Sequence, residues 1–456
     1  MEQNSTTVKQ RSSFTGKLGF VLAAAGSAVG LGNIWRFPYL AAKYGGGIFL
    51  LVYIILSLTF GFTLMVAEIA IGRKTRQSPI GAFRSLDKRF SFIGILASIV
   101  PMLILPYYSV IGGWVIKYSV GFISGSLGEM AEGSYFGNYI GSTWEPIIWF
   151  GAFILATALI VLFGVQKGIE KVSKIMMPIL LALMVFIIVY TFINTDGIWE
   201  GVAYYLKPDF SKFSYMTVVS AMGQLFYSMS LAMGIMITFG SYMKKDISIE
   251  KSVHQIEIFD TGIAFLAGLM IVPACVAYDP TQISKGPGLM FGVLPKIFDD
   301  MPGGSFVGAA FFLMVLLAAL TSSISLMETV VSTVQDRWKL GRKSSVCVVL
   351  ALSIALGLLS CLGYSVWSGV AIFGKFQFLD FFDFITNSVM MPIVALLTCI
   401  FITFVIKTKT VTDEVALSGE FKLKSLFNVM IPYIAPICLV VILVFAILEG
   451  FGIISV

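Results

Sequence analysis

The chain has 456 residues, of which 57% are hydrophobic and 12% are charged, and it carries a formal net charge of +6 at pH 7. Soluble domains average about half apolar and a quarter charged residues, so the composition excludes an ordinary soluble globular protein. The five cysteines have no paired spacing and the chain has one histidine, so neither a disulfide framework nor a histidine-based catalytic or metal site is expected.

The apolar residues gather in eleven segments that are each long enough to cross a membrane as a helix. A span needs about 20 mostly apolar residues, because hydrocarbon offers no partner for backbone polar groups. The predicted spans are 20–41, 48–71, 92–123, 146–164, 173–193, 214–242, 254–278, 304–334, 345–363, 380–406 and 428–450. The sequence therefore predicts an all-α, multi-pass membrane protein of eleven transmembrane helices, in which residues 1–456 form a single transmembrane domain.

The basic residues fall mainly on one side of these spans. Most of the 31 Lys and Arg residues precede the first span or follow the second, fourth, sixth, eighth and tenth. Cytoplasmic loops collect Lys and Arg, so the N-terminus is predicted to be cytoplasmic and, with an odd number of spans, the C-terminus extracellular. This asymmetry explains the positive net charge, and no nucleic-acid partner is predicted.

Two predicted spans contain runs that weaken a helix: residues 26–33 (GSAVGLGN) in the first and residues 228–234 (SMSLAMG) in the sixth. Glycine costs up to about 1 kcal/mol in a helix interior, and serine offers the backbone competing hydrogen bonds. These spans are five apart and so run in opposite directions. That relation predicts a 5+5 inverted repeat, approximately residues 20–193 and 214–406, with broken helices 1 and 6 and an extra C-terminal helix at 428–450. Matching breaks indicate a substrate and ion site at the midplane; small residues that only permit close packing are the alternative.

Charged residues inside the predicted spans are few. Placing an Arg side chain in the middle of a membrane span costs about 2.5 to 3.5 kcal/mol, so each charged residue should have a partner. Arg36 and Asp383 are both expected just outside the binding centre, where they could form a solvated, breakable outer gate. Snorkelling of Arg36 to the headgroups is the alternative. Arg11 and Asp336 are expected near the cytoplasmic surface, where an analogous pair could close the inward path; a plain surface salt bridge is the alternative. Glu68 is expected to satisfy backbone groups near a broken helix.

The eighth span supplies hydroxyl groups in the run 318–323 (AALTSS). Sodium is a hard cation that binds oxygen, so a site would combine such hydroxyls with the carbonyls of an unwound helix. Hydroxyls that only bond back to carbonyls of their own helix are the alternative. The single histidine, His254, lies near the start of the seventh span, where a solvated position is expected.

These motifs resemble those of the neurotransmitter:sodium symporters, especially their bacterial amino acid transporters with the leucine-transporter-type fold. The most specific match is residues 26–38 (GSAVGLGNIWRFP). Further matches are Gly45 to Gly47, Glu68 with Gly72-Arg73, Tyr107-Tyr108, Gly223 to Phe226 and Leu320 to Ser323. The resemblance covers nearly the whole chain.

The resemblance implies two sodium ions and no organic cofactor. The first sodium would touch Ala28, Asn33, Ser228 and Asp260, and the second Gly26, Val29, Ala318, Thr321 and Ser322. The substrate would be held by Ser27, Ala28, Leu31, Gly32, Ile104, Tyr108, Tyr227, Ser228, Ser230, Met233, Ser322, Ser325 and Leu326.

Three positions refine what the resemblance implies. Similar monoamine carriers place an Asp where this chain has Gly30, so a complete amino acid is favoured here, and the apolar pocket implies a neutral hydrophobic one, aromatic ones included. Asp260 stands where most members have Asn, and its carboxylate is expected to replace the chloride that animal members require, so chloride is not required. Ala232 replaces a glycine that is common in the break of helix 6.

The fifth span begins with a G-x9-P spacing from Gly168 to Pro178. Proline removes a backbone hydrogen bond, so the cytoplasmic end of this helix is hypothesised to unwind and let water reach the second sodium. An ordinary proline kink is the alternative.

The predicted function is sodium-coupled symport of neutral hydrophobic or aromatic L-amino acids by alternating access into a bacterial cell, with the lipid bilayer of the plasma membrane around the protein. A proton- or antiport-coupled carrier of the same fold is the alternative, and a non-transporting receptor also stays open. A membrane enzyme is not predicted, because no nucleophile with a base and no metal cluster is present in the sequence.

Overall fold

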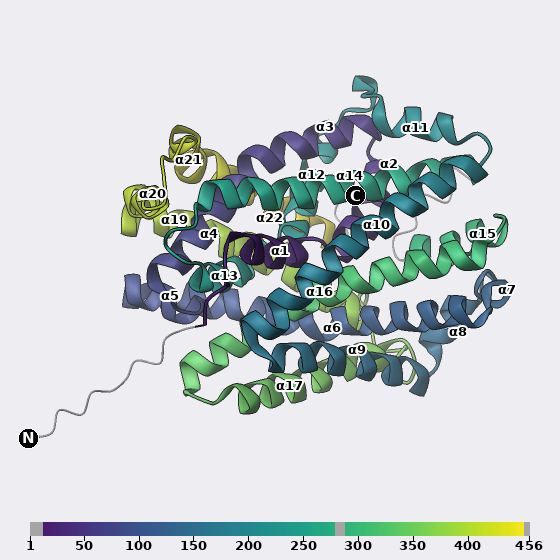
Figure 1. Cartoon of the computed structure of the whole chain (residues 1–456), viewed down its shortest axis with the longest axis horizontal. Coiled ribbons are helices and arrows are strands. Elements are labelled where there is room, and N and C mark those ends of the chain that lie inside the picture. Colours follow the sequence, from purple (N-terminus) through teal and green to yellow (C-terminus); the bar gives the residue numbers. More distant parts are fainter. Residues whose placement is uncertain (1–11, 279–287, 451–456) are drawn as a thin grey trace, which may run out of the picture.

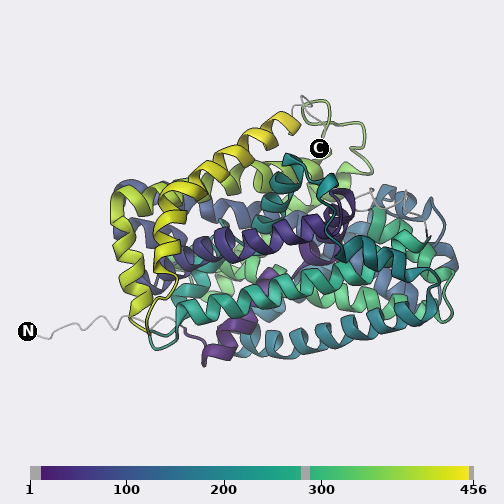
Figure 2. The same ribbon diagram turned by 90° about the horizontal axis from the view of Figure 1, so that it is seen from above.

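The structure is a computed structural model of the chain that describes residues 12–278 and 288–450 (Figure 1). Regular secondary structure in these residues is helical, and β-structure is limited to two isolated bridges, Gly46 with Pro208 and Ile372 with Phe376. The predicted all-α fold is confirmed. The long helices run roughly along the long axis of the molecule (Figures 1 and 2).

In the first half of the chain the helices are α1 (Lys17–Ala28), η1 (Gly32–Arg36), α2 (Phe37–Lys43), α3 (Gly47–Leu56), η2 (Ser57–Gly61), α4 (Phe62–Thr75), α5 (Pro79–Leu86), η3 (Lys88–Phe90), α6 (Ser91–Ser124), α7 (Leu127–Met130), α8 (Tyr135–Gly141), α9 (Trp144–Leu162), η4 (Val165–Glu170), α10 (Lys171–Asn194), α11 (Ile198–Leu206) and η5 (Phe210–Lys212). In the second half they are α12 (Tyr215–Ser228), α13 (Ile235–Tyr242), α14 (Ile249–Tyr278), η7 (Leu289–Val293), α15 (Leu294–Asp299), α16 (Gly304–Trp338), α17 (Arg342–Gly363), α18 (Phe378–Asp383), η8 (Phe384–Met390), α19 (Met391–Ile400), η9 (Phe401–Ile406), α20 (Lys407–Ala416), α21 (Lys424–Val429), η10 (Met430–Ile434) and α22 (Ala435–Gly450).

Nine helical runs in the described residues are long and apolar enough to cross a membrane, and the pair Lys17–Ala28 and Gly32–Lys43, bent by 52°, makes a tenth. The break between α12 and α13 leaves two pieces that do not meet the same length criterion. The count of eleven therefore stays a prediction. The tenth predicted span, 380–406, lies within a longer run, Phe378–Ala416.

The broken first span lies inside the bundle. α1 packs against α14, α16 and α10, and α6 runs beside α16 along much of its length (Figure 1). The last helices of the chain, drawn in yellow, lie along one flank (Figure 2). Only 22% of the apolar window in Lys424–Gly450 is buried inside the protein, so most of this run faces outward.

One end of the bundle is tied together by buried charges. The guanidinium of Arg73, at the end of α4, donates to the Glu414 carboxylate at 2.8 Å, to the carbonyl of Glu414, and to the carbonyl of Ile247 at 2.8 Å. Both charged side chains are almost wholly buried. Nearby, the Glu250 carboxylate accepts the backbone N–H groups of Lys422 at 3.1 Å and Leu423 at 3.0 Å. These contacts join α4, α14, α20 and the segment before α21.

The first described residues pack onto the same end. Phe14 is fully buried and makes edge-to-face contacts with Phe20, Phe239 and Tyr242. The Glu170 carboxylate, at the end of η4, accepts the backbone N–H of Thr15 at 2.9 Å. This segment therefore closes over the junction of α1, α13 and η4.

Candidate functional site

Both predicted interruptions are real breaks. α1 ends at Ala28, and Val29 is extended, with φ −73° and ψ 107°. In the other break, Ser230, Ala232 and Gly234 have φ of 53°, 60° and 70°. The left-handed region costs a residue with a β-carbon about 1–2 kcal/mol, so this segment must be held by its surroundings.

Side chains from other helices hold the freed backbone. The Ser230 hydroxyl donates to the carbonyl of Ser27 at 3.0 Å, which joins the two breaks directly. The Gln224 amide donates to the carbonyl of Gly32 at 2.8 Å. The backbone N–H of Ala232 donates to the Glu68 carboxylate at 2.7 Å, which confirms the role expected for Glu68.

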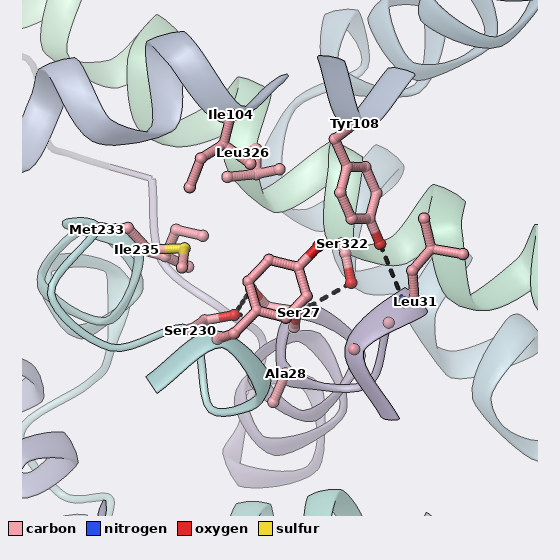
Figure 3. A pocket seen from close by; sticks show the side chains of 13 residues that line it. Ser27, Ala28, Leu31, Ile104, Tyr108, Ser230, Met233, Ile235, Ser322 and Leu326 are labelled. Atoms are coloured by element: carbon pink, nitrogen blue, oxygen red, sulfur yellow. Dashed lines mark hydrogen bonds between the residues drawn. The ribbon is translucent and has the colours of Figure 1, made fainter. Parts of the chain in front are cut away.

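A pocket lies between the two breaks (Figure 3). It is lined by Ser27, Ala28, Gly30, Leu31, Gly32, Ile104, Tyr108, Tyr227, Ser230, Met233, Ile235, Ser322 and Leu326. All but two of the predicted substrate residues are among them; Ser228 and Ser325 do not line the pocket. The Ser228 hydroxyl donates to Asp260 and the Ser325 hydroxyl to the carbonyl of Thr321, so both are turned elsewhere.

The pocket has a polar and an apolar end. Ser27, Ser230 and Ser322 gather where the breaks meet, and the Tyr108 hydroxyl accepts the N–H of Leu31 at 3.3 Å (Figure 3). At the other end lie the side chains of Ile104, Met233, Ile235 and Leu326 (Figure 3). Among the described residues, the lining contains no Asp, Glu, Lys, Arg or His. A charged group in this pocket would therefore meet backbone dipoles and hydroxyls.

Three of the four residues expected around the first sodium are in contact, and the fourth, Ala28, lines the adjoining pocket. The Asn33 amide donates to Asp260 Oδ1 at 2.7 Å and the Ser228 hydroxyl does so at 2.8 Å, while the Tyr53 hydroxyl lies 3.4 Å from Oδ2. Asn33, Ser228 and Asp260 are all buried. The contacts of the Asp260 carboxylate within the described chain are neutral groups, so a cation bound here would supply the missing positive charge.

The residues expected around the second sodium also meet. The Ser322 hydroxyl lies 3.1 Å from the carbonyl of Val29, 3.0 Å from that of Ser27 and 3.5 Å from that of Gly26. The Thr321 hydroxyl instead bonds back to its own helix, at 3.0 Å from the carbonyl of Ala318. Hydroxyl back-bonding, the alternative considered for this run, thus holds for Thr321 but not for Ser322.

Comparisons with known proteins identify the family of this chain. The sequence model of the family described as "Sodium:neurotransmitter symporter family" matches residues 11–130 and 140–451. The chain belongs to this family of sodium symporters. The symporter is 35% identical to the sodium-dependent transporter YhdH of Bacillus subtilis over 93% of its own length and 95% of that protein. It is 31% identical to a sodium-dependent transporter of Haemophilus influenzae, with 96% and 99% covered.

A solved structure, MhsT in complex with L-phenylalanine, superposes on the symporter with a TM-score of 0.87. The two chains are 36% identical, and the match covers 96% of the symporter and 100% of MhsT. The fold predicted from the resemblance is therefore confirmed. The symporter is a multi-pass membrane transporter coupled to sodium and not an enzyme.

The predicted gates of the symporter have other partners. In the part of the chain that the structure describes, no ion pair joins Arg36 to Asp383. The Arg36 guanidinium lies 5.6 Å from the ring centroid of Tyr227, and Asp383 Oδ1 accepts from Asn387 at 2.6 Å and Tyr107 at 3.2 Å. The two side chains thus make no direct ion pair here, and each contacts other groups.

At the inner gate, Asp336 accepts the backbone N–H of Ser78 at 2.8 Å, which connects α16 to the start of α5. Arg11 lies outside the described residues. A role for either pair as a gate stays a prediction.

The sequence reasoning missed Ile235 as a pocket residue. Ile235 is not part of any motif named above, although Met233, two positions before it, is one of the predicted substrate residues. The left-handed Gly234 between them turns the chain so that both side chains line the pocket. Gly30 also lines the pocket, and a β-carbon there would lie 2.5 Å from Ser322 Oγ and 2.8 Å from the Tyr108 hydroxyl, so a side chain at this position would require both to move.

Proposed function

We propose that this symporter imports neutral hydrophobic L-amino acids, aromatic ones included, together with two sodium ions by alternating access. The observation that carries the proposal is the pocket between the two helix breaks, polar at one end and apolar at the other. An amino acid has the same division, because its zwitterionic head must be solvated while its side chain favours apolar contacts.

The head of the substrate would meet the two breaks. The N–H groups of the helix 1 break would face the carboxylate, and carbonyls of the helix 6 break would face the ammonium group. A lining without charged side chains fits a ligand that is neutral overall. The side chain would lie among Ile104, Met233, Ile235 and Leu326, where flexible Met233 can repack around ligands of different shape. MhsT, the related solved protein, is in complex with L-phenylalanine.

The two groups of oxygens described above would hold the sodium ions, which are transported with the substrate. Asp260 gives the first group a fixed negative charge among neutral donors, and for this reason chloride would not be required. Two sodium ions crossing with a zwitterion gain about 4.6 kcal/mol per 100 mV of membrane potential. That gain supports accumulation of substrate before any sodium concentration gradient is counted.

We place the symporter in the bacterial plasma membrane with its N-terminus in the cytoplasm and its C-terminus outside. The proposal rests on the distribution of Lys and Arg along the chain and on the bacterial relatives.

The test is uptake of each labelled proteinogenic amino acid into proteoliposomes, with and without an inward sodium gradient. We expect sodium-dependent uptake of Leu, Ile, Met, Phe, Tyr or Trp, and little of charged or small polar amino acids. Uptake that continues when choline replaces sodium, and that follows a proton gradient, would favour the proton-coupled alternative. Uptake that stops when gluconate replaces chloride would contradict chloride independence, and binding without counterflow of labelled substrate would indicate a receptor.

A further inference from the structure

Helix α14 carries a row of three titratable side chains, His254, Glu257 and Asp260. Residues three apart lie on one face of a helix and are separated by about 4.5 Å along its axis. The row starts near the N-terminal end of α14, on the proposed cytoplasmic side, and ends at the first sodium group. Chains of His, Glu and Asp within membrane spans are characteristic of proton-handling sites.

His254 and Glu257 form a pair with unequal access to solvent. His254 Nδ1 lies 3.1 Å from Glu257 Oε2, and the side chains are 39% and 2% exposed. The His254 ring also stacks on Phe62 of α4, with a centroid distance of 4.7 Å and an interplanar angle of 18°. The other carboxylate oxygen, Glu257 Oε1, is buried and has no hydrogen-bond partner within the described residues.

Among the described residues, Glu257 has no permanent positive charge as its ion-pair partner. The ion pair with His254 is the one that the structure shows for Glu257 within the described residues, and no Lys or Arg lies within 4 Å of its carboxylate there. The other charged groups that act on the pair are carboxylates, Glu250 on the His254 side and Asp260 on the Glu257 side. Tyr53 of α3 lies beyond Asp260, and α4 contributes the apolar ring of Phe62. The counter-ion of a buried carboxylate is thus a histidine, whose own charge changes near neutral pH.

We propose that His254 and Glu257 form a proton-binding site whose occupancy opposes sodium binding at Asp260, one helical turn away. With one proton shared, the pair is neutral overall. When the proton leaves through exposed His254, Glu257 becomes a second negative charge beside Asp260, and two negative charges attract a cation more strongly than one. This inference rests on the first sodium position of the proposed function.

Thermodynamic reciprocity makes the coupling measurable from both sides. If loss of the proton favours sodium, binding of sodium must expel the proton into the solution. We expect the half-saturating sodium concentration of the wild type to fall at least about fivefold between pH 6 and pH 8, within the usual range of coupling between two sites.

The test uses the purified full-length symporter in detergent and in a weak buffer at pH 7. Sodium chloride replaces potassium chloride stepwise at constant ionic strength. A pH indicator dye measures released protons, and a parallel assay measures bound ²²Na.

We expect the wild type to release protons over the same range of sodium concentration in which it binds ²²Na. Glu257→Gln should bind ²²Na without releasing protons and with no dependence of sodium affinity on pH.

Two further variants keep the experiment decisive if Glu257→Gln folds poorly. His254→Gln removes the exposed partner through which the proton would leave, so we expect the proton signal to be lost. Asp87→Asn removes an exposed carboxylate that pairs with Arg89, far from this row in the chain, and should release protons like the wild type. Proton release that persists in both Glu257→Gln and His254→Gln, or ²²Na binding by the wild type without proton release, would overturn the inference. Absence of ²²Na binding would instead overturn the proposed sodium site and, with it, the inference.

Discussion

Ser322 and Ser323 are neighbours on α16 with the same side chain, yet their hydroxyls have different partners. Ser322 Oγ reaches across to the carbonyls of Ser27 and Val29 in the break of helix 1. Ser323 Oγ donates to the carbonyl of Leu320 in its own helix at 3.0 Å and lies 2.8 Å from the Thr157 hydroxyl. Successive residues on a helix point about 100° apart, so only one of the two can face α1.

This difference provides a prediction with an internal control. Ser322→Ala removes an oxygen from the proposed second sodium site, and we expect the sodium concentration for half-maximal uptake to rise at least about tenfold, equivalent to about 1.4 kcal/mol. Ser323→Ala removes a hydroxyl of the same kind from the other face and should leave that concentration within about twofold. Sodium titration of uptake in proteoliposomes measures both, and equal effects of the two substitutions would contradict the assignment of Ser322.

At the scale of the element, η4 and α10 form one continuous helical run from Val165 to Asn194 with Pro178 inside it. The predicted unwinding of its first turns is thus not present in this structure, where Glu170 is held by Thr15 and Lys174. A β-carbon on Gly26 would lie 3.5 Å from the sulfur of Met177, so the run contacts the proposed second sodium site one residue before the proline. Unwinding of this segment would therefore directly change the packing around the proposed second sodium site.

We predict that Pro178→Ala slows release of sodium to the proposed cytoplasmic side. Alanine restores the backbone donor that proline lacks and removes the clash with the preceding turn, so the helix resists opening. Stopped-flow measurement of sodium dissociation from reconstituted symporter should show a rate several-fold below that of the wild type. Pro146→Ala is the control, because Pro146 lies in the first turn of α9, where no intrahelical bond is lost. An unchanged rate for Pro178→Ala would favour an ordinary kink.

At the scale of the whole molecule, the Arg73 cluster joins segments that are far apart in the chain. Arg73 and Glu414 are 341 residues apart, and Arg73 also holds the carbonyl of Ile247 between α13 and α14. Removing one partner of a buried ion pair leaves the other charge without compensation, at a cost of about 3–5 kcal/mol. The connection from α20 to α21 therefore depends on a residue at the end of α4.

We expect Arg73→Ala to lower the thermal stability of the detergent-solubilised symporter by several degrees or more, because Glu414 stays buried without its cation. Arg89→Ala provides a matched control: its side chain is 80% exposed and pairs with Asp87, and exposed pairs contribute about 0–1 kcal/mol. Fluorescence-detected size-exclusion chromatography after heating compares the variants. Equal stability of Arg73→Ala and Arg89→Ala would show that the buried cluster does not hold this end of the bundle.

The sequence by itself determined the membrane helices and the two breaks. These are local properties: apolar runs of sufficient length form spans, and glycines and serines weaken a helix wherever it packs. The expectation that Ser27, Tyr108 and Met233 line the pocket came from the family resemblance, which carries residues over position by position.

Only the tertiary structure decided which way each side chain points. Asn33, Ser228 and Asp260 converge from three helices, as the resemblance implied, but Ser228 faces Asp260 and does not line the pocket. Arg36 lies over an aromatic ring instead of pairing with Asp383. His254, expected to be solvated, is half-buried against Phe62 and a buried carboxylate. Such contacts depend on the rotation of each helix about its axis and on partners distant in the chain, and a one-dimensional pattern does not specify either of them.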